Sequence, residues 1–283
     1  MNSMQELLGN MFRDRQLSED EYVNKQDGLV YCRICHTPRQ TAIRAGDGSI
    51  VFCPPVLCDC KQAERDVEDA MREAKRKAEE IKSLKRAGFR DRRLLEYTFA
   101  NDKGYNPEIA MAKRYVELFP DMEARGMGLL LWGNVGTGKT FIAACIANAL
   151  MEQRIPVYMT NFSRIMNHMM GMVGPDRNAY LDELNRYRLL VIDDLGVEHD
   201  SSFAVEQVFS VIDSRCQSGK PMLITTNLSI DQLRSPRDIA HARIFDRVLA
   251  HCCPVRINNT QIRQRDAERN IAEAKRLLDG VAK

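Results

Sequence analysis

A glycine-rich run that ends in lysine and threonine lies in the middle of the chain, Gly133-Asn-Val-Gly-Thr-Gly-Lys-Thr140. It matches the pattern G-x-x-x-x-G-K-[ST], and it lies between an apolar run typical of a strand and a Gly- and Pro-free segment typical of a helix. Glycines let backbone N–H groups turn inward around a phosphate, and the N-terminus of the following helix adds its dipole. The motif therefore predicts a phosphate-binding loop for a nucleoside triphosphate such as ATP.

Two side chains of this loop are expected to act on the nucleotide. We predict that the Lys139 ammonium reaches the β- and γ-phosphates and that the Thr140 hydroxyl coordinates Mg²⁺. The neighbouring positions supply the rest of the cradle, so the predicted nucleotide-binding residues of the loop are Gly133, Asn134, Val135, Gly136, Thr137, Gly138, Lys139, Thr140 and Phe141.

Two carboxylates follow a second apolar run, Arg188-Leu-Leu-Val-Ile-Asp193-Asp194. Open α/β sheets bind their ligands at the carboxyl ends of the strands. A cation held by nucleotide phosphates needs an acidic partner, and Asp193 can serve it through coordinated water. Asp194 then faces the γ-phosphate, where we expect it to orient and activate the attacking water. Two acids after a strand are by themselves more often a helix cap or a turn, so this interpretation depends on the loop at 133–140.

Two further polar positions are weaker candidates. Asn227 ends the apolar run Lys220-Pro-Met-Leu-Ile-Thr-Thr-Asn227 and could touch a γ-phosphate, although an asparagine after a strand is more often a turn residue. Arg243 and Arg247 are four residues apart and therefore share one helix face. From the residues alone, a surface ion pair is the favoured interpretation of Arg247.

Five of the nine cysteines lie between Cys32 and Cys60. Two short-spaced pairs separated by 22 residues can close a tetrahedral thiolate site, and such a site can hold together a module too small to fold on its own core. We predict Zn²⁺ bound by Cys32, Cys35, Cys58 and Cys60. Cys53 and His36 are alternative ligands, and an iron–sulfur cluster or free structural cysteines are alternative interpretations.

The elements that must position these residues follow from the apolar pattern. After about Glu96, short apolar runs alternate with helical patterns, as in βαβ units around a parallel sheet. We predict strands at 128–133, 155–160, 188–194, 220–227 and 251–257, and helices at 107–118, 138–152, 162–170, 178–186, 202–217, 238–249 and 259–279. The predicted fold class is α/β, with a parallel sheet flanked by helices and a small N-terminal zinc-binding module.

The segment between the cysteines and the α/β region has no Gly or Pro from 61 to 87, and 16 of its 27 residues are charged. Its small and apolar residues recur at helical spacing, which predicts one long amphipathic helix. A solvated connector is favoured over a partner-binding coiled coil, because fewer than four heptads are present. The predicted domains are a zinc-binding module at 1–60, a charged helical linker at 61–95 and a nucleotide-binding domain at 96–283.

The composition of the 283 residues excludes several classes of protein. Apolar residues make up 44% and charged residues 28%, which excludes a largely disordered or low-complexity chain. Lys and Arg number 41 against 39 Asp and Glu, so any nucleic-acid binding must come from local patches. No apolar run is long enough for a membrane span and no targeting segment is evident, so we expect a cytoplasmic protein without a membrane partner.

The order GNVGTGKT, LLVIDDLG, ITTN and ARIFDRVL resembles the DnaC-type helicase loaders of the AAA+ superfamily and the related IstB-like transposition helper ATPases. The segment AGFRDRRLLEYTF at 87–99 is also similar to the approach to the ATPase core in that family. The resemblance implies an AAA+ fold and slow, partner-stimulated ATP hydrolysis. It further implies Lys139 and Thr140 as nucleotide and magnesium residues, Asp193 as the magnesium carboxylate, Asp194 as the hydrolytic position, Asn227 as the first sensor and Arg247 as an arginine finger for a neighbouring subunit.

The same resemblance implies partners. The zinc-bearing module is similar to that of DnaI-like loaders, which implies that it engages a DnaB-like hexameric replicative helicase while the AAA+ domains self-associate and bind single-stranded DNA in replication initiation. An IstB-like helper that binds duplex DNA, or a nucleotide-switch adaptor without hydrolysis, are the alternatives. Asp194 stands where many AAA+ proteins carry the longer Glu, which favours slow turnover, and Arg263 is a weak candidate for a second sensor.

A methionine-rich segment, Phe162 to Met170, continues toward Tyr187 at the position where the initiator and loader clade has an extra helix along a single-strand channel. Phe162, Arg164 and His168 could offer stacking and positive charge to DNA. Adaptable core packing is the favoured interpretation of the methionines.

Overall fold

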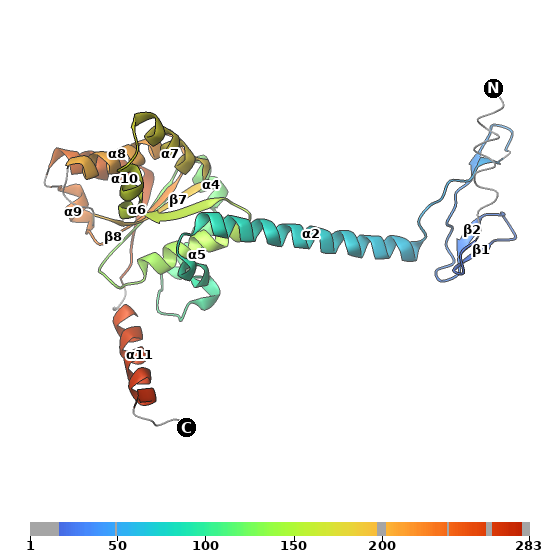
Figure 1. The fold of residues 1–283 in the computed structure, drawn as a ribbon, viewed down its shortest axis with the longest axis horizontal. Coiled ribbons are helices and arrows are strands. Elements are labelled where there is room, and N and C mark those ends of the chain that lie inside the picture. Colours follow the sequence, from blue (N-terminus) through green and yellow to red (C-terminus); the bar gives the residue numbers. More distant parts are fainter. Residues whose placement is uncertain (1–16, 49, 197–201, 237, 259–261, 279–283) are drawn as a thin grey trace. The chain divides into compact units, whose positions relative to one another are not determined.

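The structure of the protein is a computed structural model that describes residues 17–48, 50–196, 202–236, 238–258 and 262–278. The chain divides into two compact units, residues 1–78 and 79–283 (Figure 1). Among the described residues, no helix combines the length and the apolar character that a bilayer span requires.

The first unit consists of two short antiparallel hairpins and the beginning of a helix. Strand β1 (Glu21–Val23) pairs with β2 (Val30–Cys32), and β3 (Ile43–Arg44) pairs with β4 (Ile50–Phe52). The buried apolar side chains among its described residues are Val30, Cys32 and Cys58. Such a core buries little apolar surface, so the unit needs a further cross-link to hold its hairpins together.

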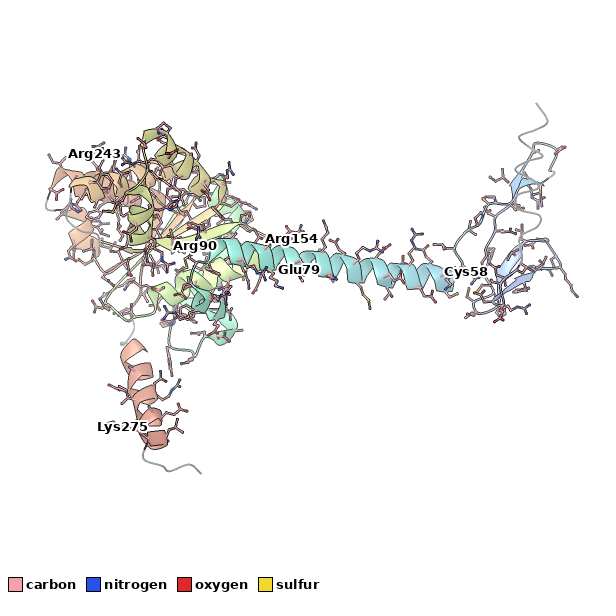
Figure 2. The ribbon with its side chains drawn as sticks, in the orientation of Figure 1. Cys58, Glu79, Arg90, Arg154, Arg243 and Lys275 are labelled. Atoms are coloured by element: carbon pink, nitrogen blue, oxygen red, sulfur yellow. The ribbon has the colours of Figure 1, made fainter. Side chains whose placement is uncertain are left out.

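The predicted amphipathic helix is confirmed as α2, which runs without a break from Asp59 to Gly88. Its surface carries ion pairs three residues apart, among them Lys61–Glu64 and Glu73–Arg76. The last turns belong to the second unit, where Glu80 pairs with Arg154 and Lys85 pairs with Glu152. Arg154 lies beside this part of α2 in Figure 2. Two short 3-10 helices, Arg92–Glu96 and Phe99–Asn101, follow.

The core of the second unit is a five-stranded sheet in the order β6-β7-β8-β5-β9, and every neighbouring pair is parallel. All five predicted strands are confirmed, and the α/β fold class with them. Their bounds are β5 Gly128–Trp132, β6 Val157–Asn161, β7 Leu189–Leu195, β8 Met222–Thr226 and β9 Cys252–Arg256. The strand order reverses around β5, and in open α/β sheets such a reversal opens a crevice at the carboxyl ends of the strands.

Helices cover both faces of this sheet (Figure 1). Because successive side chains of a strand point to opposite faces, Leu130 joins one core while Leu129 and Leu131 join the other. The first core contains residues of α6, α7, α8 and α10, and the second contains residues of α3, α4 and α5. The bounds of these helices are α3 Ile109–Glu117, α4 Phe119–Ala124, α5 Lys139–Glu152, α6 Phe162–Met169, α7 Gly174–Arg186, α8 Ser202–Gln217 and α10 Ile239–His251.

Most predicted helices agree with these bounds to within a few residues, and two short helices were not predicted. The helix α4 is six residues long and α9 (Ile230–Arg234) is five, which is too short for an apolar period to be visible. The helix α7 begins four residues before its prediction, because Pro175 stands in its first turn, where a missing N–H costs nothing. The last helix, α11, spans Ile262–Leu278.

Candidate nucleotide site and metal centre

The predicted phosphate loop connects the carboxyl end of β5 to the first turn of α5. Gly133 has a φ of 147°, and a Cβ there would lie 2.4 Å from the carbonyl oxygen of Ile257, so only glycine fits. Gly138 caps α5 with a φ of 99°. The Thr137 hydroxyl, almost fully buried, donates to the carbonyl oxygen of Asn134 at 2.9 Å and fixes the turn, while Val135 is exposed at its tip. The loop is therefore shaped by its sequence before any ligand arrives.

Lys139 lies inside the loop. Its ammonium donates to the carbonyl oxygens of Gly133 at 2.9 Å and Asn134 at 2.8 Å, and to Oδ1 of Asn227 at 2.7 Å. The residue is only 5% exposed. The structure thus brings together a cation from α5 and the amide that follows β8, which are 88 positions apart in the sequence.

Thr140 and Asp193 meet at the same edge of the sheet. The Thr140 hydroxyl lies 3.1 and 3.0 Å from the two carboxylate oxygens of Asp193. Burial is the main cause that raises the pKa of Asp193, with the neighbouring charge of Asp194 adding to it. A hydroxyl and a carboxylate at this distance are the hard oxygen donors that suit Mg²⁺, and a cation here would stabilise the charged form of this half-buried acid.

Asp194 occupies a special backbone position. Its φ is 60°, in the left-handed region that few side chains adopt, although aspartate tolerates it better than most. Its side chain is exposed, whereas the backbone N–H is held by the hydroxyl of Thr225 at 3.0 Å. The two acids therefore point to different surroundings: Asp193 lies against Thr140, and Asp194 lies at the open surface.

Arg247 lies on α10 and is partly buried. Its guanidinium forms an ion pair with Asp213 of α8 and lies over the ring of Phe209 at 4.7 Å. Arg243 covers the same ring at 4.1 Å, and it projects from the exposed side of α10 (Figure 2). Within one chain, Arg247 is therefore a surface ion pair, as the residues alone favour.

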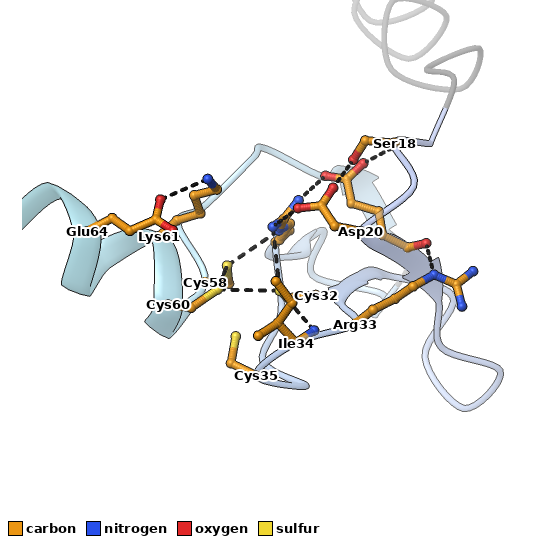
Figure 3. Close-up of polar contacts among 12 residues, drawn as sticks. Ser18, Asp20, Cys32, Arg33, Ile34, Cys35, Cys58, Cys60, Lys61 and Glu64 are labelled. Carbon is orange, nitrogen blue, oxygen red and sulfur yellow. Dashed lines mark hydrogen bonds and ion pairs between the residues drawn. The ribbon is translucent and has the colours of Figure 1, made fainter.

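The four cysteines predicted to bind zinc lie together in the first unit. Their sulfur atoms are all within 4.8 Å of one another, and two of the distances are 3.5 Å (Cys32 to Cys60) and 3.4 Å (Cys58 to Cys60). Tetrahedral zinc with Zn–S bonds of about 2.3 Å would separate its sulfurs by about 3.8 Å, so the cluster fits Zn²⁺. In Figure 3 the four side chains converge on one point. Among the described residues, neither Cys53 nor His36 belongs to this cluster.

Arg39 places a positive charge beside this cluster, and the sequence analysis did not predict this contact. Its guanidinium donates to the sulfurs of Cys58 at 3.4 Å and Cys32 at 3.5 Å, and its other bonds go to Asp20 and Glu21. Four thiolates around Zn²⁺ carry a net charge of −2, so a buried cation beside them is favourable. A single arginine between two cysteine pairs gives no periodic signal, which is why the pattern did not reveal it.

The sulfurs of the cluster differ in acidity. A hydrogen bond with the Thr37 hydroxyl lowers the pKa of Cys35 to about 5, while hydrogen bonding with Cys58 raises the pKa of Cys60 to about 12. The Thr37 hydroxyl and the hydrogen bonds among the sulfurs thus move the pKa values of Cys35 and Cys60 in opposite directions. Zn²⁺ binds cysteines as thiolates.

The helices at 162–187 form a hollow of about 280 Å³ with strand β6 and the end of α2, within the second unit. The rings of His168 and Tyr180 pack at a tilt with their centroids 4.5 Å apart, Tyr158 stacks on Tyr187 at 5.1 Å, and Arg90 lies just past α2 (Figure 2). The idea that Phe162 offers a stacking face is wrong, because it is 1% exposed and packs in the core under α6. The side chain of Arg263 lies outside the described residues.

Together, the fold and the site define the class of the protein. A parallel sheet in this order, a phosphate loop after β5 and a half-buried acid beside the loop threonine make it a P-loop nucleotide-binding protein of the AAA+ type. A family model described as IstB-like ATP binding protein matches residues 63–270. The chain therefore belongs to this family.

Comparison with known proteins gives relatives at moderate identity. The chain is 28% identical over 147 residues to the replicative helicase loader DnaI of Bacillus subtilis, covering 47% of each chain. It is 28% identical over 149 residues to the replicative helicase loader DnaC of Escherichia coli, covering 52% of this chain and 58% of the relative. The chain thus spans about half the length of the relatives it matches. A crystal structure of DnaI superposes with a TM-score of 0.51 at 24% identity, over 62% of this chain and 94% of the other.

Proposed function

We propose that this protein is an ATP-dependent loader of a replicative DNA helicase onto single-stranded DNA. One observation carries the nucleotide part of the proposal: Lys139, Thr140, Asp193 and Asn227, which come from three separate segments, meet at one edge of the sheet. The loader part rests on the similarity to proteins named as replicative helicase loaders.

In the proposed reaction, the loop backbone and the Lys139 ammonium hold the phosphates of ATP. The ammonium exchanges its carbonyl partners for phosphate oxygens, and Asn227 stays close enough to contact the γ-phosphate or its water. Thr140 and Asp193 hold Mg²⁺, which when bound neutralises phosphate charge. Asp194 is the base that orients the attacking water, and its short side chain favours slow turnover.

The first unit is the proposed attachment to the helicase, with Zn²⁺ held by Cys32, Cys35, Cys58 and Cys60. Zinc here would be structural: it supplies the cross-link that the small core lacks. Single-stranded DNA is the proposed partner of the second unit, where the exposed ring of His168 and the exposed Arg86 and Arg90 at the hollow provide stacking and positive charge.

The proposal predicts that loading needs nucleotide, metal and single strands together. The purified full chain is mixed with the replicative hexameric helicase of its host, MgATP and either single-stranded or duplex DNA, and helicase transfer to DNA is measured by filter binding and unwinding. Transfer to single strands that requires MgATP supports the proposal. Capture of duplex DNA without helicase would favour a transposition helper, and transfer with ATP bound but never cleaved would favour a switch without hydrolysis.

Arg247→Ala separates the proposed arginine finger from a merely structural ion pair. A guanidinium supplied to a neighbouring subunit's γ-phosphate is worth about 10³-fold or more in turnover. We therefore expect the variant to bind MgATP like the wild type but to lose most of the ATPase activity that helicase and DNA stimulate. Arg243→Ala is the matched control, since Arg243 lies over the same Phe209 ring on the same helix. Normal stimulated turnover in the Arg247 variant would exclude the finger.

A further inference from the structure

The two acids at the end of β7 form a β-bulge opposite a single residue of β8. Ile192 pairs with Ile224 and Leu195 pairs with Thr226, so Asp193 and Asp194 together face Thr225. The left-handed φ of Asp194 is the backbone turn that accommodates the extra residue. Bulges commonly lie next to active sites, where they change the direction of a side chain.

The Thr225 side chain binds both residues of this bulge. Its hydroxyl donates to Oδ1 of Asp193 at 2.5 Å and accepts the backbone N–H of Asp194 at 3.0 Å. A regular ladder bond is missing at a bulge, and here a side-chain hydroxyl replaces it. Thr225 is completely buried, so water cannot take over either bond.

The position of Asp193 depends on this contact from one side and on Thr140 from the other. The hydroxyls of Thr225 and Thr140 both reach its carboxylate. Without the Thr225 hydroxyl, Oδ1 of the half-buried Asp193 would lose its shortest hydrogen bond. The N–H of Asp194, at the left-handed turn, would also lose its acceptor.

We propose that Thr225 is a positioning residue for the magnesium carboxylate and the hydrolytic acid: its hydroxyl fixes the bulge that aims Asp193 at Thr140 and places Asp194 beside the γ-phosphate site. Threonine is the β-branched residue that fits a buried strand while also providing a hydroxyl. This inference rests on the proposed function, because it assigns Thr225 to the same nucleotide site.

Thr225→Val tests the hydroxyl, because valine has nearly the same shape and no polar atom. ATP binding is measured by calorimetry with Mg²⁺ and again with a chelator. We expect the affinity gained from Mg²⁺ to fall about tenfold or more, as for loss of one hydrogen bond to a charged group. ATP binding without Mg²⁺ should stay unchanged. Thr225→Ser keeps the hydroxyl and is expected to keep the magnesium effect.

Thr226→Val is the matched structural control. Thr226 is the next residue of β8 and is also fully buried, but its hydroxyl bonds only to backbone groups, the carbonyl oxygen of Leu195 and the N–H of Leu228. It should lower stability without changing the magnesium effect. An equal loss of the magnesium effect in both valine variants would mean that any buried polar loss disturbs the site, and would overturn the proposal.

A second measurement needs no nucleotide. The amide of Asp194 is protected from hydrogen exchange by its bond to Thr225, so NMR should show faster exchange at this one amide in Thr225→Val and normal exchange in Thr225→Ser. Unchanged exchange together with an unchanged magnesium effect contradicts the proposal. So does a Thr225→Val variant that fails to fold while Thr225→Ser and Thr226→Val fold, since the hydroxyl then serves the fold. If the wild type itself binds no MgATP, the proposed function fails instead, whatever the exchange shows.

Discussion

Replacing Lys139 with alanine is expected to lower the affinity for MgATP by at least about a hundredfold, since hydrogen bonds to charged groups each contribute about 1.5–3 kcal/mol and the ammonium reaches more than one phosphate oxygen. The reason lies in the geometry of the loop. The ammonium is almost fully buried and already lies between the carbonyl oxygens of Gly133 and Asn134, so no other described cation can take its place without moving the loop. Calorimetric titration of the full chain with ATP and Mg²⁺ measures the effect.

Lys220→Ala is the control for this variant. Lys220 precedes β8 and donates to the carbonyl oxygen of Asn185 at 2.6 Å, at the opposite end of the sheet from the phosphate loop. Removing it deletes a partly buried lysine in the same domain, and MgATP affinity should remain at the wild-type value. Tight MgATP binding by the Lys139 variant, in protein with a normal circular dichroism spectrum, would remove the basis of the proposed function.

Replacing Cys58 with serine is expected to abolish stoichiometric zinc binding and to unfold the first unit. Structural zinc sites contribute about 10–16 kcal/mol to the folding of small modules, far more than the few buried apolar side chains of this unit can replace. Cys58 is buried and contacts both Cys60 and Arg39, so its loss opens the cluster and leaves the guanidinium without one of its partners. Metal analysis and limited proteolysis should show zinc-free protein that is cut within residues 17–58.

The second unit should be insensitive to this change, because its two cores contain no residue of the cluster. MgATP binding and the main thermal transition are therefore expected to persist in the Cys58 variant. Cys53→Ser is the matched control: Cys53 lies in the same region but outside the cluster, so zinc content and protease resistance should not change. Loss of zinc in the Cys53 variant, or zinc retained in the Cys58 variant, would show that a different set of ligands is used.

Much of the sheet could be predicted from the sequence because its signals are local. The strands β5, β6, β7 and β8 are buried on both faces, so each is a short apolar run such as Leu189–Ile192, and these runs alternate with helical patterns. The phosphate loop could be predicted for the same reason, since its residues are contiguous. The short helices α4 and α9 could not, because a single turn or two shows no period.

The sequence did not predict which candidate side chains are buried or which residues they contact. Phe162 begins α6. The sequence indicates an apolar face on this helix, but it does not show that Phe162 is buried in the core. Arg247 and Asp213 are 34 positions apart and lie on different helices. The sequence alone therefore could not identify Asp213 as the acid that pairs with Arg247.

The sequence by itself determined the order of the motifs and the fold class, and it predicted two candidate residue sets, one of thiolates and one for phosphate binding. Only the tertiary structure showed that four of the six possible zinc ligands lie together and that the Arg39 guanidinium contacts their sulfurs. It also showed that Thr225 faces both Asp193 and Asp194 at a bulge. The physical reason is that residue type and helix or strand period are properties of neighbouring residues. Convergence depends instead on strand register and on the packing of segments that lie tens of residues apart.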